Sequence, residues 1–121
     1  MMNTEFIREY CLVKKEVTEC LPFGPSVLVF KVCGKIFLLM SLDSMPLQFN
    51  AKCNPDLAID LREKYIAIIP GFHMNKTHWN TIIVDGTLSD NFVLQQIDNS
   101  YNLIVESLPK KVCANIVFLL C

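Results

Sequence analysis

The sequence predicts a two-layer α+β fold, in which an antiparallel five-stranded sheet carries its helices on one face. Three observations support this prediction. Apolar, β-branched runs are separated by tight turn signals, which is typical of antiparallel strands. Other stretches repeat apolar residues at helical spacing outside those runs. The chain has 121 residues, enough for one domain with a core and too few for two. The predicted order is α-β-β-β-α-β-β-α.

The first predicted element is a helix that begins at Asn3 or Thr4 and ends near Lys14. The side chain of Asn3 or of Thr4 can cap the free amides at the start of this helix. Residues 16–25 are expected to form a connector, because they contain a proline and then a Gly-Pro pair. The buried face of the helix is expected to consist of Phe6, Ile7, Tyr10 and Cys11.

A hairpin and a third strand follow. Residues 27–32 and 35–40 are rich in strand-forming residues, and Cys33-Gly34 between them predicts a tight turn. Residues 46–51 predict a shorter strand that starts at Pro46, where no ladder N–H is needed.

The middle helix is predicted from its start signals. Asn54 can cap it, Pro55 suits the first helical position, and Asp56 favours the positive end of the helix dipole. Its buried face is expected to contain Leu57, Ala58, Leu61 and Tyr65. Two strands follow, over residues 67–72 with an interruption at Pro70-Gly71, and over residues 79–84.

Ser89 predicts the start of the last helix, and Pro109 predicts its end. Its apolar stripe contains Val93, Ile97, Tyr101, Ile104 and Leu108. We expect residues 1–111 to form a single domain. Residues 112–121 are almost wholly apolar, so we expect them to add a strand or to contact another chain.

Composition narrows the functional class. The net charge of −1 argues against a protein that coats nucleic acid, although residues 31–76 carry six basic residues against four acidic ones. No apolar run is long enough to span a membrane, and charged residues interrupt the first turns, so we expect a cytoplasmic protein without a membrane partner. The six cysteines contain no Cys-x-x-Cys pair. We expect them to be reduced and to pack as small apolar residues, with a redox or metal role as the alternative.

Residues 70–84 form the stretch that is densest in recognition chemistry. It contains two histidines, one lysine and two asparagines, and a loop after its Pro-Gly turn leads into a strand that begins with the only tryptophan. Lysines and histidines can contact phosphates, asparagines can donate hydrogen bonds, and Phe72 or Trp79 can act as a wedge or stacking surface. The candidate nucleic-acid-binding residues are Lys31, Lys35, Lys52, His73, Asn75, Lys76, His78, Trp79 and Asn80.

Other interpretations of these residues stay open. The lysines can protect strand edges or bind a small phosphate-bearing ligand. Trp79 can anchor the core, and the two histidines can serve the loop itself. Cys53 with His73 or His78 could form a metal or nucleophilic site, but neither the spacing nor a motif supports one. We therefore expect no enzyme activity, no metal and no cofactor.

Several short motifs occur in a fixed order along most of the chain: Pro22-Phe23-Gly24, residues 29–32 with Gly34-Lys35, residues 52–55 with Leu61-Arg62, residues 70–76 with residues 78–81, and Ser100-Tyr101 with residues 108–111. With these motifs the chain resembles the MmcQ/YjbR family of small bacterial proteins. The resemblance implies a secretion-chaperone-like α+β fold, a cytoplasmic location and the double-wing DNA-binding role proposed for that family. The apolar tail and the absence of a basic net charge depart from the family pattern.

Two hypotheses of different classes follow from the sequence. The first is a non-enzymatic protein that binds double-stranded DNA weakly, through backbone phosphates, with a basic loop and hairpin. The alternative is a protein-interaction module, chaperone-like or a homodimer through the sheet or the tail, that has no nucleic-acid role.

Overall fold

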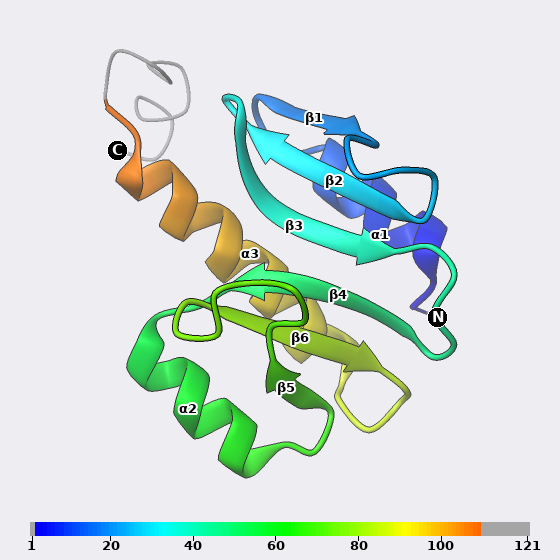
Figure 1. Cartoon of the computed structure of the whole chain (residues 1–121), viewed down its shortest axis with the longest axis vertical. Coiled ribbons are helices and arrows are strands. Elements are labelled where there is room, and N and C mark those ends of the chain that lie inside the picture. The colour runs from blue at the N-terminus through cyan, green and yellow to red at the C-terminus, as the bar shows by residue number, and fades with distance from the viewer. Residues whose placement is uncertain (1, 110–121) are drawn as a thin grey trace.

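The computed structural model describes residues 2–109, and the expectations for the apolar tail at residues 112–121 lie outside this range. Figure 1 shows an antiparallel sheet with helices beside and behind it. The sheet has six strands in the order β1-β2-β3-β4-β6-β5, so the prediction of five strands was wrong. The elements are α1 (Thr4–Leu12), β1 (Val17–Cys20), β2 (Val27–Val32), β3 (Lys35–Ser41), β4 (Leu47–Lys52), α2 (Pro55–Lys64), β5 (Ile68–Pro70), β6 (Trp79–Val84) and α3 (Asp90–Ser107).

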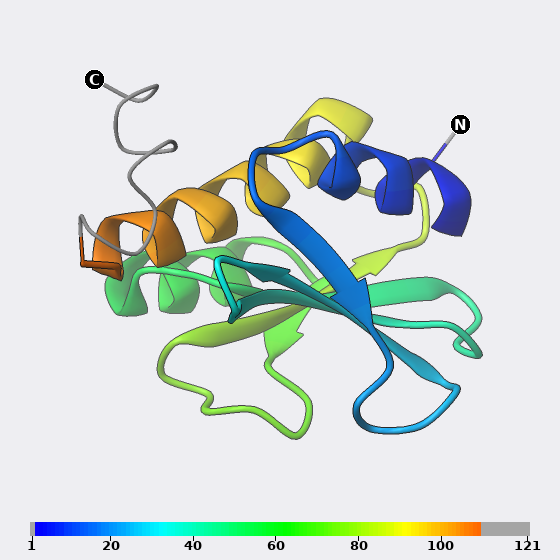
Figure 2. The same ribbon diagram turned by 90° about the horizontal axis from the view of Figure 1, so that it is seen from above.

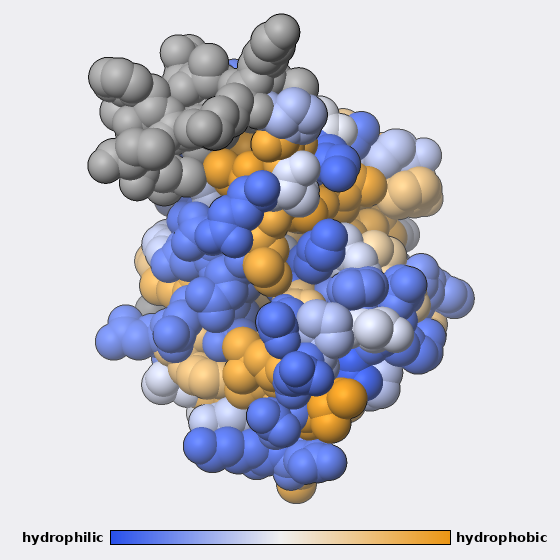
Figure 3. Space-filling view, turned by 90° about the vertical axis from the view of Figure 1, so that its left-hand side faces the viewer, coloured by the Kyte–Doolittle hydropathy of each residue, from blue (hydrophilic) through white to orange (hydrophobic). Residues whose placement is uncertain are grey.

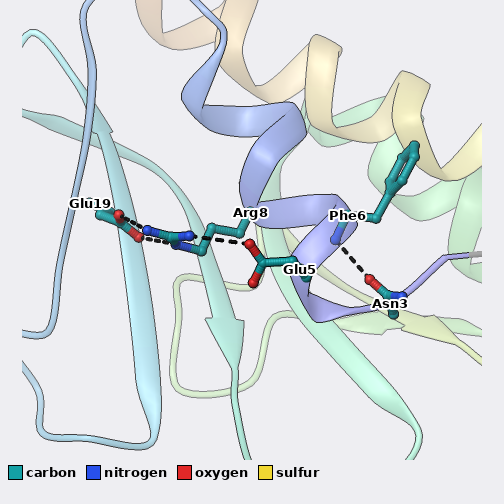
Figure 4. A network of polar contacts seen from close by, with 5 residues as sticks. All are labelled: Asn3, Glu5, Phe6, Arg8 and Glu19. Atoms are coloured by element: carbon teal, nitrogen blue, oxygen red, sulfur yellow. Dashed lines mark hydrogen bonds and ion pairs between the residues drawn. The ribbon is translucent and has the colours of Figure 1, made fainter.

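The additional strand, β1, lies in the segment predicted to be a connector. It pairs antiparallel with β2, with Glu19 opposite Phe30. Its carboxylate faces α1, where it accepts hydrogen bonds from Arg8 Nε at 2.7 Å and Nη2 at 2.6 Å (Figure 4). Arg8 holds the pKa of Glu19 below its usual value through these bonds. A charged residue thus occupies an inward-facing strand position, which hides the apolar alternation by which a strand is recognised.

Side-chain caps start the three helices where the sequence predicts them. Asn3 Oδ1 accepts a hydrogen bond from the backbone N–H of Phe6 at 2.8 Å (Figure 4). Asn54 accepts from two amides of α2, and Ser89 accepts from Phe92 N at 3.2 Å. Each cap satisfies amides that lack a partner within the helix, and removing such a cap typically costs about 1 kcal/mol.

The helices cover one face of the sheet, and the core lies between the two layers (Figure 2). α3 packs across β2, β3 and β4, whereas α1 contacts β1 and α2 contacts β5 and β6. Leu57, which the sequence places in the buried face of α2, is 41% exposed, so that prediction was wrong. The largest fully buried side chains are Phe30, Phe37, Phe49, Ile7, Leu38, Met40, Ile68, Ile82, Ile97, Val29 and Val32.

A buried hydroxyl group joins α3 to the sheet. The register between β2 and β3 shifts between Phe30 and Lys31, and Phe37 lies opposite this irregularity. Ser100 Oγ donates to the carbonyl oxygen of Phe37 and accepts from the N–H of Lys52 at 2.8 Å. One hydroxyl therefore satisfies two backbone groups where the ladder between β3 and β4 ends.

A polar cluster joins α1 to α3. Tyr10 donates to Asp98, with an oxygen-oxygen distance of 2.9 Å, and Lys14 Nζ lies 2.6 Å from the same carboxylate. Burial, followed by the bond to Asp98, raises the pKa of Tyr10 to about 12. The hydroxyl therefore stays protonated and continues to donate through the physiological pH range.

Within residues 2–109, no helix is long and apolar enough to cross a membrane. Cys11, Cys20 and Cys53 are free thiols, as expected from the sequence, whereas Cys33 is disulfide-bonded and departs from that expectation. Burial raises the pKa of Cys11 to about 12, so this thiol is protonated at neutral pH and packs as a small apolar side chain.

Candidate functional site

The sheet face opposite the helices is flanked by two loops. We call residues 21–26, between β1 and β2, the first wing, and residues 71–78, between β5 and β6, the second wing. Figure 2 shows both loops projecting from the sheet on the side away from α1 and α3. The sheet surface between them is called the open face. Because side chains alternate along a strand, the open face is formed by the residues that lie between the core-facing ones.

A cavity of about 450 Å³ lies on the open face between the two wings. The first wing contributes Phe23, and the second wing contributes Phe72, His73 and Met74. Both phenylalanine side chains are largely exposed, at 65% and 59%. The other lining residues belong to the strands and the β3–β4 loop, and the full set is Phe23, Val27, Leu39, Ser41, Asp43, Ser44, Gln48, Phe49, Asn50, Phe72, His73 and Met74.

Side chains of the open face hold the start of the second wing. Asn50 on β4 lies opposite Thr81 on β6 and accepts a hydrogen bond from its hydroxyl group. Asn50 Nδ2 donates to the carbonyl oxygen of Phe72 at 3.0 Å, and the N–H of Phe72 donates to Thr81 Oγ1 at 3.0 Å. Both backbone groups of Phe72 are thus bonded to the sheet, which directs its ring over the cavity.

Helix α2 holds the end of the second wing through Arg62. Arg62 Nε donates to Asn80 Oδ1 at 2.7 Å, and Nη2 donates to the carbonyl oxygen of Lys76. The Asn80 amide also donates to the carbonyl oxygen of Ala58 at 3.4 Å. Asn80 is 1% exposed and its side chain is engaged at both ends, so it supports the loop and does not face solvent.

The remaining polar residues of the second wing are divided between the loop and solvent. Asn75 accepts from Thr77 N at 2.8 Å through its side chain and from Trp79 N at 3.0 Å through its carbonyl oxygen. The side chains of His73, Lys76 and His78 are exposed. His73 has a φ of 58°, in the left-handed region, and its ring centroid lies 4.0 Å from that of Phe72.

Gly71 is required by a close approach within the second wing. Its N–H donates to the carbonyl oxygen of Trp79 at 2.9 Å. A Cβ atom at Gly71 would lie 2.8 Å from Trp79 Cβ and 2.9 Å from that carbonyl oxygen. Trp79 itself is half-buried at the start of β6, so it anchors the loop while leaving part of its indole ring accessible.

The predicted lysines are only partly brought together. Lys31 and Lys52 each lie between two core-facing residues, so both belong to the open face, and Lys52 is directly opposite Trp79. Lys35 lies at the end of the β2–β3 hairpin, and Lys76 lies in the second wing. Within the part of the chain that the structure describes, none of these four lysines forms an ion pair with a carboxylate.

The open face and both wings are free of carboxylates apart from Asp43, which lines the cavity from the β3–β4 loop. Glu19, the acidic residue of β1, points to the helix side, where it pairs with Arg8. The net charge of −1 therefore hides an uneven distribution, because most acidic residues lie in or beside the helices.

The alternative site at Cys53 is not assembled. Cys53 is buried, and burial raises the pKa of its thiol, which disfavours the thiolate that a nucleophile or metal ligand needs. Its N–H donates to the carbonyl oxygen of His78 at 2.8 Å, so the two residues meet through their backbones. Among residues 2–109, no group of three or more His, Cys, Asp or Glu side chains is placed to hold a metal ion.

Several residues of this region were not singled out from the sequence as site residues. Phe23 and Gln48 line the cavity, and Arg62, Asn50 and Thr81 support the second wing. The signal for β4 was available, because Gln48, Asn50 and Lys52 alternate with apolar residues and therefore predict one polar face. Nothing in the sequence indicates that this face lies beside Phe23, which is distant along the chain.

Comparisons with known proteins agree with this architecture. The chain is 40% identical over 93 residues to the uncharacterized protein YbdF of Escherichia coli O157:H7, covering 76% of this chain and 75% of that protein. It is 28% identical over 111 residues to the uncharacterized protein YjbR of E. coli strain K12, covering 91% and 93%.

Two solved structures are similar in fold. A Deinococcus radiodurans protein with the domain DUF419 superimposes with a TM-score of 0.89 at 28% identity, covering 95% of this chain and 88% of that one. A Pseudomonas syringae protein superimposes with a TM-score of 0.73 at 26% identity, covering 84% and 98%. The sequence model of the YjbR family matches residues 12–103, which include the sheet, both wings and most of α3. The chain belongs to the YjbR family.

Proposed function

We propose that the protein is a weak, non-enzymatic DNA-binding protein that contacts backbone phosphates with its open face and second wing. The observation that carries this proposal is the distribution of charge. Lys31 and Lys52 lie on the open face, and Lys76, His73 and His78 lie on the adjacent wing. Cations without carboxylate partners, grouped on one side of a protein, attract a polyanion even when the net charge is near zero.

The geometry favours contact with the backbone over reading of sequence. Lys31 and Lys52 lie on β2 and β4, two strand spacings apart, which corresponds to roughly 10 Å. Phosphate contacts of this kind position a protein on nucleic acid but carry no sequence information. In addition, the side chains of Asn75 in the second wing and Asn80 in β6 are engaged within the protein, so they are poor candidates for reading base edges.

A titration against duplex DNA at several salt concentrations tests the proposal. We expect measurable binding at about 50 mM salt. A plot of the logarithm of the binding constant against the logarithm of the salt concentration should fall with a slope of about −0.9 for each phosphate contacted. The double substitution Lys52→Ala with Lys76→Ala should lower the affinity and reduce the magnitude of the slope by about 2.

The matched control is Lys15→Ala with Lys64→Ala, because it removes the same charge from exposed lysines outside the open face and wings. This control should keep the slope of the unmodified protein. Equal losses in both double variants would show that only the net charge matters. Absence of binding at low salt would refute the DNA proposal.

A protein-interaction module is the second candidate, and one observation favours it. The helix α2 and the residues after it expose apolar side chains at Leu57, Ile59 and Ile66, the last of which is 97% exposed. On the described surface of the side in Figure 3, hydrophobic residues form separate patches among hydrophilic ones. Small patches of this kind suit a limited contact more than an obligate interface.

Sedimentation of the full chain and of the variant Ile59→Ser with Ile66→Ser tests this candidate, since an assembly that uses α2 should dissociate in the variant.

A further inference from the structure

The cavity between the wings is not needed for phosphate contacts, and its lining differs from the rest of the open face. Most of its lining is apolar, with Leu39 and Val27 on the sheet and the rings of Phe23 and Phe72 on opposite wings. Its volume of about 450 Å³ lies in the range of pockets that enclose small organic groups. Two exposed aromatic rings beside one apolar cavity form a surface on which another flat ring can stack.

Polar groups with free hydrogen-bonding capacity lie at the border of this cavity. In the described part of the chain, the side-chain amide of Gln48 has no hydrogen-bond partner, and Asp43 accepts only from Ser41, at 3.2 Å. Asn50, by contrast, already uses both ends of its amide, because it donates to the carbonyl oxygen of Phe72 and accepts from Thr81. Gln48 can therefore donate and accept, and Asp43 can accept, which are the functions needed to bind the edge of a heterocyclic base.

The position of the lysines relative to the cavity indicates which chemical groups a ligand of the cavity should carry. Gln48, Asn50 and Lys52 follow one another along the open side of β4, so the Lys52 position lies roughly 13 Å from Gln48. Asp43 lies at the other end, in the β3–β4 loop. A ligand that extends along β4 would thus meet hydrogen-bonding groups and aromatic rings first, and then Lys52, which lies opposite Trp79 in the register of β4 and β6.

We infer that the cavity between the wings binds an unpaired nucleobase of single-stranded nucleic acid, while the adjacent phosphates contact Lys52 and Lys31. This inference rests on the proposed nucleic-acid function and specifies its ligand. Bases that are free of pairing present both a flat ring and a hydrogen-bonding edge, and aromatic side chains recognise them by stacking. A base stacked in a duplex cannot enter such a cavity without being unpaired. An apolar peptide side chain would use the rings but not the flanking lysines.

The deciding experiment compares a short single-stranded oligodeoxynucleotide with an oligomer of equal length built from abasic sites. The two strands carry the same phosphates and differ only in their bases. We expect the base-containing strand to bind about tenfold more tightly, within the range found for stacking of one base on aromatic side chains. The double variant Phe23→Ser with Phe72→Ser should bind the two strands equally and retain its salt dependence.

Phe6→Ser is the matched control, because Phe6 is 43% exposed on α1, on the other side of the sheet, and its replacement should leave the tenfold difference unchanged. A second measurement locates the base directly. Ring currents from a base in the cavity should shift the methyl resonance of Met74, which lines it, in the base-containing complex but not in the abasic one.

The possible failures are distinguishable. Equal, salt-dependent binding of both strands by the unmodified protein would overturn the base assignment and leave the phosphate proposal intact. Absence of binding by either strand at low salt, with duplex DNA still bound, would overturn the inference alone, whereas absence of binding by both strands and by duplex DNA would remove the proposed function itself. A Met74 shift produced by an apolar peptide, with none produced by oligonucleotide, would assign the cavity to a polypeptide and overturn the inference.

Discussion

The two wings lie on the same side of the sheet and line the same cavity, yet they are held in different ways. The second wing is bonded to the sheet through Asn50 and Thr81 and to α2 through Arg62. The first wing has one weak turn bond, from Gly24 N to Leu21 O at 3.4 Å, and a bond at its end from Leu42 N to Ser26 O at 2.8 Å. One wall of the cavity is therefore fixed by the fold, and the other is attached mainly at its ends.

This difference explains why polar residues are so dense between Pro70 and Thr81. A long loop needs partners for its backbone groups. In this chain the side chains of Asn75 and Thr81 accept hydrogen bonds from backbone N–H groups of the loop. Asn80 accepts from Arg62, which also donates to a backbone carbonyl oxygen of the loop. The density of polar side chains thus reflects the construction of the second wing as much as recognition. The first wing has no such density but supplies Phe23, which is the more exposed of the two rings.

The largest effect is expected from Arg62→Ala. The substitution removes the hydrogen bonds from α2 to Lys76 in the second wing and to Asn80 in β6, and it leaves Asn80 Oδ1 buried without its charged donor. Because a bond to a charged group contributes about 1.5–3 kcal/mol and an unpaired buried acceptor is costly, we expect unfolding free energy to fall by about 3 kcal/mol. Urea unfolding followed by circular dichroism measures this change.

Glu63→Ala, at an exposed position of the same helix, is the control and should change stability by less than about 0.5 kcal/mol. If Arg62→Ala also stays within that limit, α2 does not hold the second wing. The contrast between the wings would then be lost.

A smaller loss is expected from Gly71→Ala. The added methyl group would approach the Cβ and the carbonyl oxygen of Trp79 to within 3 Å, and those atoms belong to the start of β6. Backbone atoms in a strand cannot move aside as the end of a flexible side chain can, so we expect a cost of about 2 kcal/mol. The near-ultraviolet circular dichroism of Trp79 should change as well, because the loop must shift relative to the indole ring. An unchanged spectrum with wild-type stability would mean that the two segments are not in close contact.

The local features of the fold could be predicted from the sequence, because the interactions that create them are also local. The caps at Asn3, Asn54 and Ser89 and the Cys33-Gly34 turn each depend on residues within a few positions. The strand β1 could not be predicted in the same way. Its inward-facing Glu19 is compensated by Arg8, eleven positions earlier, and that pairing exists only after α1 has packed against the sheet.

The candidate site shows the same limit. The sequence located the second wing correctly as a loop before a strand, since the turn and the strand signals are local. It could not distinguish Asn80, which is buried against Arg62 and Ala58, from Lys76, which is exposed, because burial depends on the placement of α2. It also could not associate Phe23 with Phe72, since the two wings meet only across the width of the sheet.

A more modest effect is expected from Thr81→Val, which keeps the shape of the side chain and removes its hydroxyl group. The N–H of Phe72 and the side chain of Asn50 would each lose one hydrogen bond, and both bonds are partly buried. We expect a loss of about 1 kcal/mol. Thr18→Val is the control, because Thr18 is exposed on β1 and makes no side-chain hydrogen bond within residues 2–109, so its replacement should be close to neutral. Equal effects of the two substitutions on thermal unfolding would argue against a fixed second wing.

The smallest effects are expected from removing the exposed rings, and here the two wings should differ least. Phe23→Ser and Phe72→Ser each replace a side chain that is mostly in solvent, so each should change unfolding free energy by no more than about 0.5 kcal/mol. Phe72→Ser should have the larger effect of the two, because it also removes the contact with the ring of His73. If Phe23→Ser instead costs more than about 1 kcal/mol in chemical unfolding, Phe23 contributes to folding. The loosely attached wall of the cavity would then be as firmly anchored as the other.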